Sequence, residues 1–215
     1  MDIGQREELE IEVRLRCERG DIDGAATAAI QGYGPEIYTF LAALNRGRDD
    51  VDEVFSLFAE GLWHSLPTFG WQSSLRTWAY AIARRLSLKY RRDAHQRNKR
   101  NAPLNEESSV SGAVAQVRSE TLPYLRTETK SRIAQLRDSL APEDRELLVL
   151  RVDRKLAWID LVQVLRGEEE APLEGEALKR EGARLRKRFQ IVKDKLREMA
   201  RREGLLDSGT DDDKP

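Results

Sequence analysis

The side chains of this chain that could bind another molecule are concentrated in one basic stretch, which runs from Ser74 to Arg92. Its cations are Arg76, Arg84, Arg85, Lys89, Arg91 and Arg92. Between residues 74 and 100 the only acid is Asp93. A surface with one sign of charge repels itself and favours an anionic partner, and aromatic rings beside it can stack on bases. The stretch therefore predicts contact with nucleic acid; the alternative is a solvated basic face of a helix packed on a core.

The same stretch has the spacing of an amphipathic helix. Its apolar residues recur at steps of three and four: Leu75, Trp78, Ala79, Ile82, Ala83, Leu86 and Tyr90. This period places them on one face and leaves the cations on the rest of the surface. A second helix is predicted from Asp49 to Trp63, because its acidic start suits the positive end of a helix dipole.

Glycine and proline mark the predicted ends of the helices nearer the N-terminus. An acidic helix is expected over residues 5–18, and the next from about residue 24 to residue 31. Gly32 and Gly34 are expected to interrupt that helix, and Pro35 suits the first turn of a new one.

Opposite charges are segregated along the chain, although its 215 residues carry a formal net charge of only −1. Hydrophobic residues make up 40% of the sequence and charged residues 35%, which fits a soluble, mostly helical protein. Segregated charge suits a protein that touches an acidic polymer with some faces and a protein partner with another.

Metal, cofactor and membrane functions find no support in the sequence. Cys17 is the only cysteine, and His64 and His95 lie far apart, so we expect no metal site and no cofactor. No apolar run approaches the roughly 20 residues that span a bilayer. The acidic N-terminus lacks the apolar core of a signal peptide, which predicts a cytoplasmic protein without membrane insertion.

The predicted fold class is all-α, with two small helical domains joined by a flexible linker. The expected divisions are an N-terminal acidic helix at 1–20, a first domain at 21–100, a linker at 101–127, a second domain at 128–204 and a disordered tail at 205–215. The linker is assigned from its weak periodicity and its Asn, Ser, Gly and Pro content, with room for a short helix around residues 114–118.

The basic stretch contains the string R-T-W-A-Y-A-I-A-R, from Arg76 to Arg84. It resembles the promoter-melting helix of extracytoplasmic-function sigma factors of the sigma-70 family, in which an aromatic residue leads where Leu75 stands here. The resemblance implies that the minus-10 element of a promoter is bound and melted by Phe69, Trp71, Gln72, Ser73, Ser74, Arg76, Arg84, Arg85, Lys89, Tyr90, Arg91 and Arg92. In the family, the loop before this helix captures a base flipped out of the strand. Trp71 offers a stacking face for such a base, or it packs under the helix as a core residue.

The helix that starts at Asp49 is similar to the sigma helix that docks on the β′ clamp of RNA polymerase. The resemblance implies core-polymerase contacts by Asp50, Asp52, Glu53, Phe55, Phe58 and Trp63. The family's Gln-Glu pair is replaced here by Ser56 and Leu57. A core helix with an acidic start is the alternative interpretation of this segment.

Residues 140–165 form a predicted helix, turn and helix, with Pro142 at the start. Together with residues 183–198 they resemble sigma region 4, the helix-turn-helix domain that recognises the minus-35 element. The resemblance implies DNA contacts by Arg180, Arg184, Arg186, Lys187 and Arg188. An acidic insertion at 167–178 lengthens the usual turn.

The sequence thus predicts an alternative sigma factor that directs promoter recognition and DNA melting, without catalysis of its own. Its implied partners are the RNA polymerase core enzyme, through the β′ clamp and β flap, and promoter DNA; an anti-sigma factor is a further partner that the resemblance allows. Two alternatives remain open: a stand-alone helix-turn-helix regulator that binds duplex DNA as a dimer, and a helical adaptor that binds only protein.

Overall fold

The structure, a computed structural model, describes residues 1–45, 48–93, 109–128, 132–166 and 173–206. Within these residues the chain is helical and contains no strand, which confirms the all-α fold class. The elements are α1 (Ile3–Glu18), α2 (Ile22–Leu44), α3 (Arg48–Ser65), η1 (Leu66–Thr68), α4 (Leu75–Asp93), α5 (Ser109–Glu128), α6 (Arg132–Asp138), α7 (Pro142–Leu148), η2 (Val149–Asp153), α8 (Trp158–Arg166) and α9 (Gly175–Arg202). None of the helices in the described ranges is long and apolar enough to cross a membrane.

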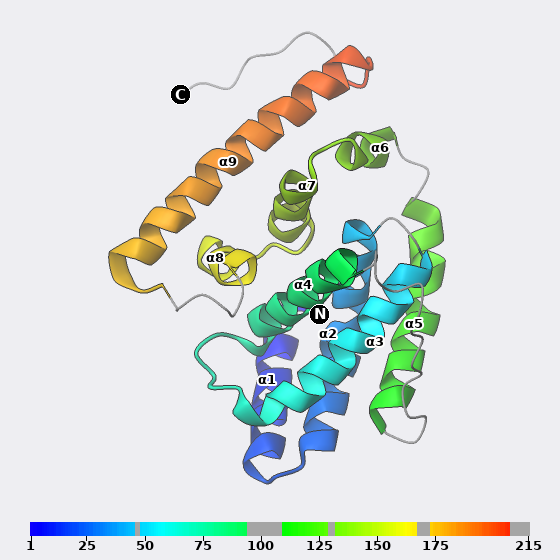
Figure 1. Cartoon of the computed structure of the whole chain (residues 1–215), viewed down its shortest axis with the longest axis vertical. Coiled ribbons are helices and arrows are strands. Elements are labelled where there is room, and N and C mark those ends of the chain that lie inside the picture. Colours follow the sequence, from blue (N-terminus) through cyan, green and yellow to red (C-terminus); the bar gives the residue numbers. More distant parts are fainter. Residues whose placement is uncertain (46–47, 94–108, 129–131, 167–172, 207–215) are drawn as a thin grey trace.

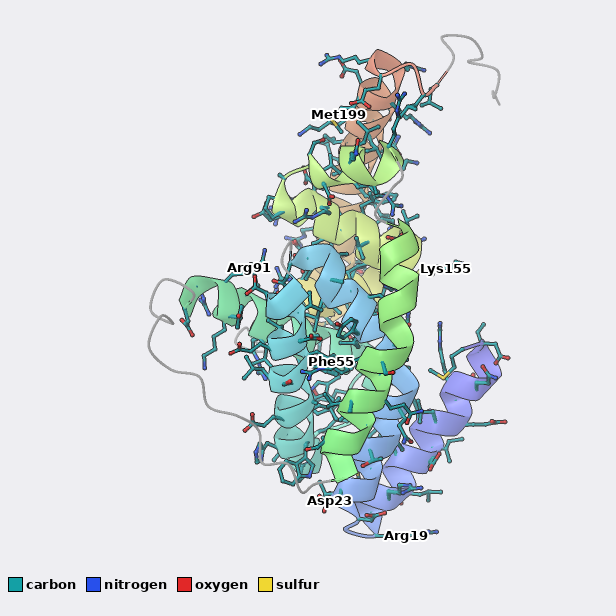
Figure 2. All side chains as sticks on the ribbon, turned by 90° about the vertical axis from the view of Figure 1, so that its right-hand side faces the viewer. Arg19, Asp23, Phe55, Arg91, Lys155 and Met199 are labelled. Carbon is teal, nitrogen blue, oxygen red and sulfur yellow. The ribbon has the colours of Figure 1, made fainter. Side chains whose placement is uncertain are left out.

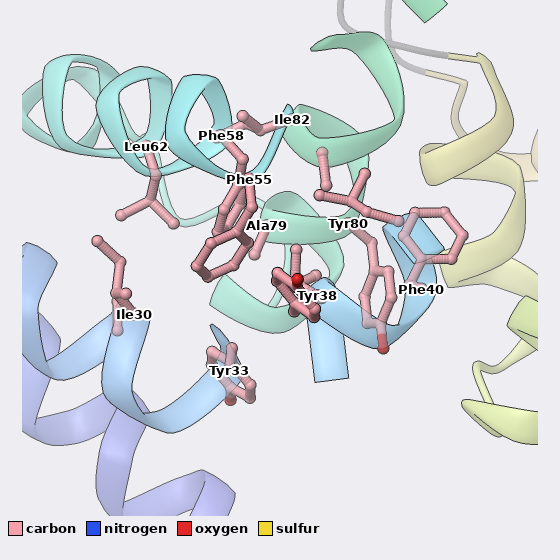
Figure 3. Close-up of a cluster of buried hydrophobic side chains, with 14 of the residues drawn as sticks. Ile30, Tyr33, Tyr38, Phe40, Phe55, Phe58, Leu62, Ala79, Tyr80 and Ile82 are labelled. Carbon is pink, nitrogen blue, oxygen red and sulfur yellow. The ribbon is translucent and has the colours of Figure 1, made fainter. Parts of the chain in front are cut away.

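Helix α2 is the centre of the first half of the molecule, where it contacts α1, α3, α4 and α5 (Figure 1). Its aromatic side chains meet those of α3 and α4 edge to face (Figure 3). The ring centroids of Tyr38 and Phe55 lie 5.3 Å apart, and those of Phe40 and Tyr80 lie 5.1 Å apart. Such pairs add about 0.5–1.5 kcal/mol each to the stability that burial supplies. The core therefore fixes the positions of α3 and α4 against one shared helix.

The predicted break in α2 is wrong, because the helix continues through Gly32, Gly34 and Pro35. The two glycines instead allow neighbouring helices to approach closely. A Cβ atom at Gly32 would lie 2.2 Å from a methyl carbon of Leu9 in α1, and one at Gly34 would lie 2.7 Å from a methyl carbon of Val117 in α5. Packing from both sides therefore outweighs the low helix propensity of these residues.

Helix α5 corrects part of the prediction that residues 101–127 form a flexible linker, from residue 109 onward. Residues 109–128 are helical, and their apolar side chains Val110, Ala113, Val114 and Val117 are buried. The helix lies along α2 and α3 (Figure 2). Its composition suggested irregular structure, but a stripe at positions 110, 113, 114 and 117 has the spacing of one helix face.

The second half of the chain places α7 and α8 between α9 and the first half (Figure 1). Pro142 opens α7, as the sequence predicted, and Glu143 and Asp144 lie in its first turn. The inner face of α9 includes Leu185 and Val192, which are buried. The outer face of α9 carries most of its charged side chains.

One cluster of buried side chains runs through both halves. Leu150, Leu161 and Val162 belong to the same cluster as the aromatic residues of α2 and α3. Helix α4 contacts α8, and α2 contacts α7. The domain boundaries at 21–100 and 128–204 stay predictions, but in this structure the helices on either side of them share a core.

Several predicted segments lie outside the described residues. They are the start of the linker, the first half of the acidic insertion at 167–178 and most of the tail at 205–215.

The position of α5 can be tested with two glycines that occupy different surroundings. We predict that Gly34→Ala lowers the free energy of unfolding by about 1–3 kcal/mol, because the new methyl group overlaps the stiff side chain of Val117. Gly112→Ala should raise it by up to about 1 kcal/mol, since nothing lies within 4 Å of a Cβ at that position. Urea denaturation measures both values. A Gly34→Ala variant as stable as Gly112→Ala would show that α5 does not pack against α2 in solution.

Candidate nucleic-acid interface

The start of α4 is fixed by a hydroxyl cap. The Oγ atom of Ser74 accepts a hydrogen bond from the backbone N–H of Thr77 at 3.0 Å, and it lies 2.8 Å from the Thr77 hydroxyl. This is the geometry of an N-cap, which satisfies one of the unpaired N–H groups of the first turn. Ser74, a predicted base-contacting residue, therefore has a structural role in orienting α4.

Arg76 is the predicted DNA-binding residue that the structure most clearly reassigns. Its side chain is almost completely covered, with 8% of the residue exposed. It donates to both carboxylate oxygens of Glu36 at 2.7 and 3.0 Å and to the carbonyl oxygen of Arg154 at 2.8 Å. Burial lowers the pKa of Arg76, but the hydrogen bonds and charge of Glu36 outweigh this effect and raise it, so the guanidinium stays charged. Arg76 holds helices together and does not face solvent.

Arg84 also meets a carboxylate inside the molecule. Its Nε atom donates to Glu146 of α7 at 2.7 Å, and both side chains are largely buried. Burial raises the pKa of Glu146, and the positive charges of Arg84 and Arg91 act in the opposite direction. A buried carboxylate of this kind needs its cation, because an unpaired charge away from water is costly.

The remaining predicted residues of α4 are more accessible. Lys89 and Arg92 are exposed, whereas Arg85, Tyr90 and Arg91 are half-buried. The hydroxyl of Tyr90 donates to Asp50 of α3 at 2.9 Å. The part of α4 that can meet a phosphate backbone in this structure therefore lies in its last two turns.

The loop before α4 contains a stack of planar side chains. Phe69 lies against Trp78 with ring centroids 4.3 Å apart and planes inclined by 16°. Trp71 follows at 4.7 Å from Phe69, and the guanidinium carbon of Arg14 lies 5.6 Å from the centroid of Trp71. The three aromatic residues are half-buried, so they both pack on α4 and retain exposed area. Gln72 is exposed beside them and Ser73 is half-buried.

Helix α3 presents only part of the predicted polymerase-docking set to solvent. Asp50 and Glu53 are exposed. Phe55 and Phe58 are 0% exposed, so their assignment to a docking surface is wrong: they are core residues. They fall on the buried face because they lie three residues apart and one helical turn beyond Val51 and Val54, which are also buried.

The other two predicted docking residues have partners within the chain. Asp52 accepts a hydrogen bond from the hydroxyl of Tyr38 at 2.7 Å, and its carboxylate lies 3.6 Å from Arg118 of α5. Trp63 is half-buried, and its indole N–H donates to Asp23 of α2 at 2.8 Å. These contacts turn Asp52 toward α5 and Trp63 toward the start of α2.

Residues that the sequence analysis missed complete these surfaces. Leu57 and Glu60 lie four and seven residues after Glu53 and therefore share its face of α3, a relation that helical spacing could have revealed. The guanidinium of Arg118 donates to the Ser56 hydroxyl and to the carbonyl oxygen of Asp52. No sequence signal connects Arg118 or Glu146 to partners more than 60 residues away.

Helix α9 carries all five residues that were predicted to contact the minus-35 element, and all five are exposed: Arg180, Arg184, Arg186, Lys187 and Arg188. Three of them also contact neighbours. Arg188 pairs with Asp144 of α7 at 2.8 Å, Arg184 pairs with Glu181 at 3.0 Å, and Arg186 lies over the ring of Trp158. Arg188 is therefore held in place by another helix, while Arg180 and Lys187 extend from the surface.

Comparison with known proteins gives a match for part of the chain. Residues 29–97 match the family model described as sigma-70 region 2. The matched segment covers most of α2, all of α3, the aromatic loop and α4. No curated protein matches the chain. The match shows that this segment, about a third of the chain, is similar to sigma-70 region 2.

The structural role of Arg76 can be measured directly. We predict that Arg76→Ala lowers the free energy of unfolding by about 3–5 kcal/mol, because it leaves Glu36 without its buried partner. Arg76→Lys should recover only part of this loss, since an ammonium cannot make the bidentate pair. Arg92→Ala, which removes an exposed cation from the same helix, should change the value by less than about 0.5 kcal/mol. Equal stability of the Arg76→Ala and Arg92→Ala variants would contradict the structural role and favour the original assignment of Arg76 to the DNA-binding surface.

Proposed function

We propose that this chain is an alternative sigma factor of the extracytoplasmic-function type, which directs RNA polymerase to promoters and helps to melt them without catalysing a reaction. The observation that carries the proposal is the order of features within residues 29–97. An acid-faced helix, an aromatic loop and a basic helix follow one another inside the segment that matches sigma-70 region 2. These three features suit polymerase docking, capture of an unpaired base and contact with the DNA backbone, respectively.

The proposed docking surface is the exposed face of α3, where acidic residues surround an apolar one. Asp50, Glu53 and Glu60 are exposed on this face, and Leu57 lies half-buried between them. An acidic rim around an apolar centre is complementary to a basic helical partner. The surface keeps Asp50 and Glu53 from the set that the resemblance implied and adds Leu57 and Glu60.

A charge reversal on this face tests docking on RNA polymerase. We predict that the double variant Glu53→Lys, Glu60→Lys weakens binding to core polymerase by at least about tenfold, because rim charges that attract the partner now repel it. Neither residue contributes to the buried core, so the thermal unfolding curve should keep its midpoint. The control is Glu7→Lys, Glu8→Lys, which makes the same charge change on the exposed part of α1. Retention of the double variant by immobilised core enzyme at the level of this control would contradict the docking assignment.

The proposed minus-35 reader is α9, supported by α8 in a helix-turn-helix arrangement. The two helices contact each other, and Trp158 at the start of α8 meets Phe189 with ring centroids 5.6 Å apart. With its apolar stripe held on the domain, α9 offers its cations to the DNA. Arginine can bridge guanine or hold phosphates, so both readout and positioning are available.

Promoter binding by both halves requires them to separate. Elements centred 10 and 35 base pairs upstream lie about 25 base pairs apart, or about 85 Å at 3.4 Å per base pair. In the structure α4 contacts α8 directly, and Arg84 is occupied by Glu146. We infer that the observed arrangement is a closed form, in which carboxylates take the place of DNA phosphates on part of α4.

A charge swap between α4 and α7 tests the closed form. We predict that Glu146→Arg separates the halves, because two buried like charges cost more than the roughly 3 kcal/mol of a broken buried pair. The radius of gyration measured by small-angle X-ray scattering should increase, and the double variant Arg84→Glu, Glu146→Arg should restore the compact value. Asp153→Asn, which removes a more exposed pair with Arg137, is the control. An unchanged radius in Glu146→Arg, with helix content preserved by circular dichroism, would refute the closed form.

A further inference from the structure

Helix α1 lies beside the aromatic loop and is anchored there by its own contacts. Val13 is fully buried in the core. The carboxylate of Glu10 accepts hydrogen bonds from the hydroxyl of Tyr33 at 3.1 Å and from the backbone N–H of Arg76 at 3.3 Å. One turn after Glu10, the side chain of Arg14 reaches the ring of Trp71. The family match begins at residue 29, so α1 lies outside it.

The backbone at Trp71 holds its ring in an unusual position. The φ angle of Trp71 is +55°, in the left-handed region that a bulky side chain rarely adopts. Such conformations persist where the surroundings impose them, and they cluster at ligand-binding sites. Trp78, Phe69 and Trp71 form a row of three rings, and the guanidinium of Arg14 lies over Trp71 at the end of that row.

Trp71 and Arg14, at the end of this row, have the composition of a base-binding site. Guanidinium groups and aromatic rings are the planar groups on which unpaired bases stack. A base between two such planes needs a separation of about 7 Å, twice the 3.4 Å stacking distance. The guanidinium carbon of Arg14 lies 5.6 Å from the centroid of Trp71, so Arg14 must move outward to admit a base, and its side chain is 59% exposed. Its ion pair with Glu18 is exposed on both sides and opposes this movement only weakly.

The charge of α1 indicates which part of a nucleic acid Arg14 would meet. Five acidic residues share α1 with three arginines, Arg6, Arg14 and Arg16: Glu7, Glu8, Glu10, Glu12 and Glu18. Two of the acids, Glu10 and Glu18, lie one helical turn before and after Arg14, where they repel a phosphate backbone but do not disfavour an uncharged base. We therefore expect Arg14 to stack on a base and not to pair with a phosphate.

We propose that Arg14 and Trp71 form a clamp that holds one unpaired nucleobase of single-stranded DNA between their planes. The proposal rests on the proposed function of the aromatic loop and adds α1 to its nucleic-acid surface. Arg14 is the specific addition, because it makes the site two-sided where Trp71 alone would offer one face. Gln72, exposed next to Trp71, is placed to donate or accept at the edge of the base.

The test uses the full chain and a random-sequence single-stranded DNA of about 12 nucleotides, labelled with a fluorophore for anisotropy. Trp71→Ala should weaken binding about 5- to 100-fold, as expected for loss of one stacked base. Arg14→Ala should weaken it about two- to fivefold, and Arg14→Lys should give nearly the same loss, because lysine keeps the charge but not the plane. The combined variant should bind no worse than Trp71→Ala, because the two residues act on the same base.

Matched variants distinguish stacking by Arg14 from a general effect of its positive charge. Arg19→Ala removes the same charge at the end of α1, in the turn before α2 (Figure 2), and should leave binding unchanged. Arg92→Ala should lower the dependence of log affinity on log salt by about 0.7, whereas Arg14→Ala should leave that slope unchanged. Binding by Arg14→Ala equal to that by Arg19→Ala, or tighter than that of the parent, would overturn the clamp. So would complete rescue by Arg14→Lys, which would show a phosphate contact.

Failure of the clamp and failure of the proposed function give different results. A chain that binds core polymerase but shows no effect of Arg14→Ala on single-stranded DNA retains its function and lacks the clamp. A chain that binds neither polymerase nor single-stranded DNA loses both proposals. The Arg14→Ala substitution lies on an exposed part of α1, so its unfolding midpoint should match that of Arg19→Ala and confirm that both variants fold.

Discussion

The buried guanidinium of Arg76 is the contact on which the arrangement of the helices depends. A charge removed from water must be paired, and Arg76 is satisfied by Glu36 of α2 and by the carbonyl oxygen of Arg154. Its backbone N–H is bonded to Glu10 of α1. One residue of α4 therefore links α1, α2 and the turn before α8. Because that link fixes the rotation of α4 about its own axis, it also decides which cations of α4 can reach solvent.

Helical spacing predicted the buried face of α4 well but could not assign its charged face. Leu75, Ala79 and Ile82 are buried as their period required. Arg76 and Arg84 look equivalent to Arg92 in the sequence, yet each of the first two meets a carboxylate at least 40 residues away along the chain. Charge on a helix surface indicates attraction to anions, and a folded protein contains anions of its own. Only the tertiary structure shows which cations of α4 are paired with carboxylates of the protein itself.

The same distinction accounts for the remaining differences between prediction and structure. Strong local signals were reliable: the acidic helix at the N-terminus, the acid-led α3 and the proline that opens α7 all lie where the sequence placed them. Gly34 was wrongly taken as a helix break, and its use in admitting Val117 depends on α5, which had been predicted to be linker. The two errors are connected. Small residues that weaken an isolated helix also let two helices approach, and the sequence alone does not show that α5 packs against α2.

On the proposed function, the internal ion pairs also change how DNA binding responds to salt. An exposed cation that meets a phosphate releases a condensed counterion, which makes affinity fall as salt rises. Arg84 is already neutralised by Glu146, so its transfer to a phosphate exchanges one anion for another and leaves a carboxylate to be hydrated. While Arg84 stays paired with Glu146, the salt dependence of binding reports the exposed cations of α4, such as Lys89 and Arg92. If the pair opens and Arg84 meets a phosphate, one more counterion is released, and the free energy of opening the pair is subtracted from the free energy of binding.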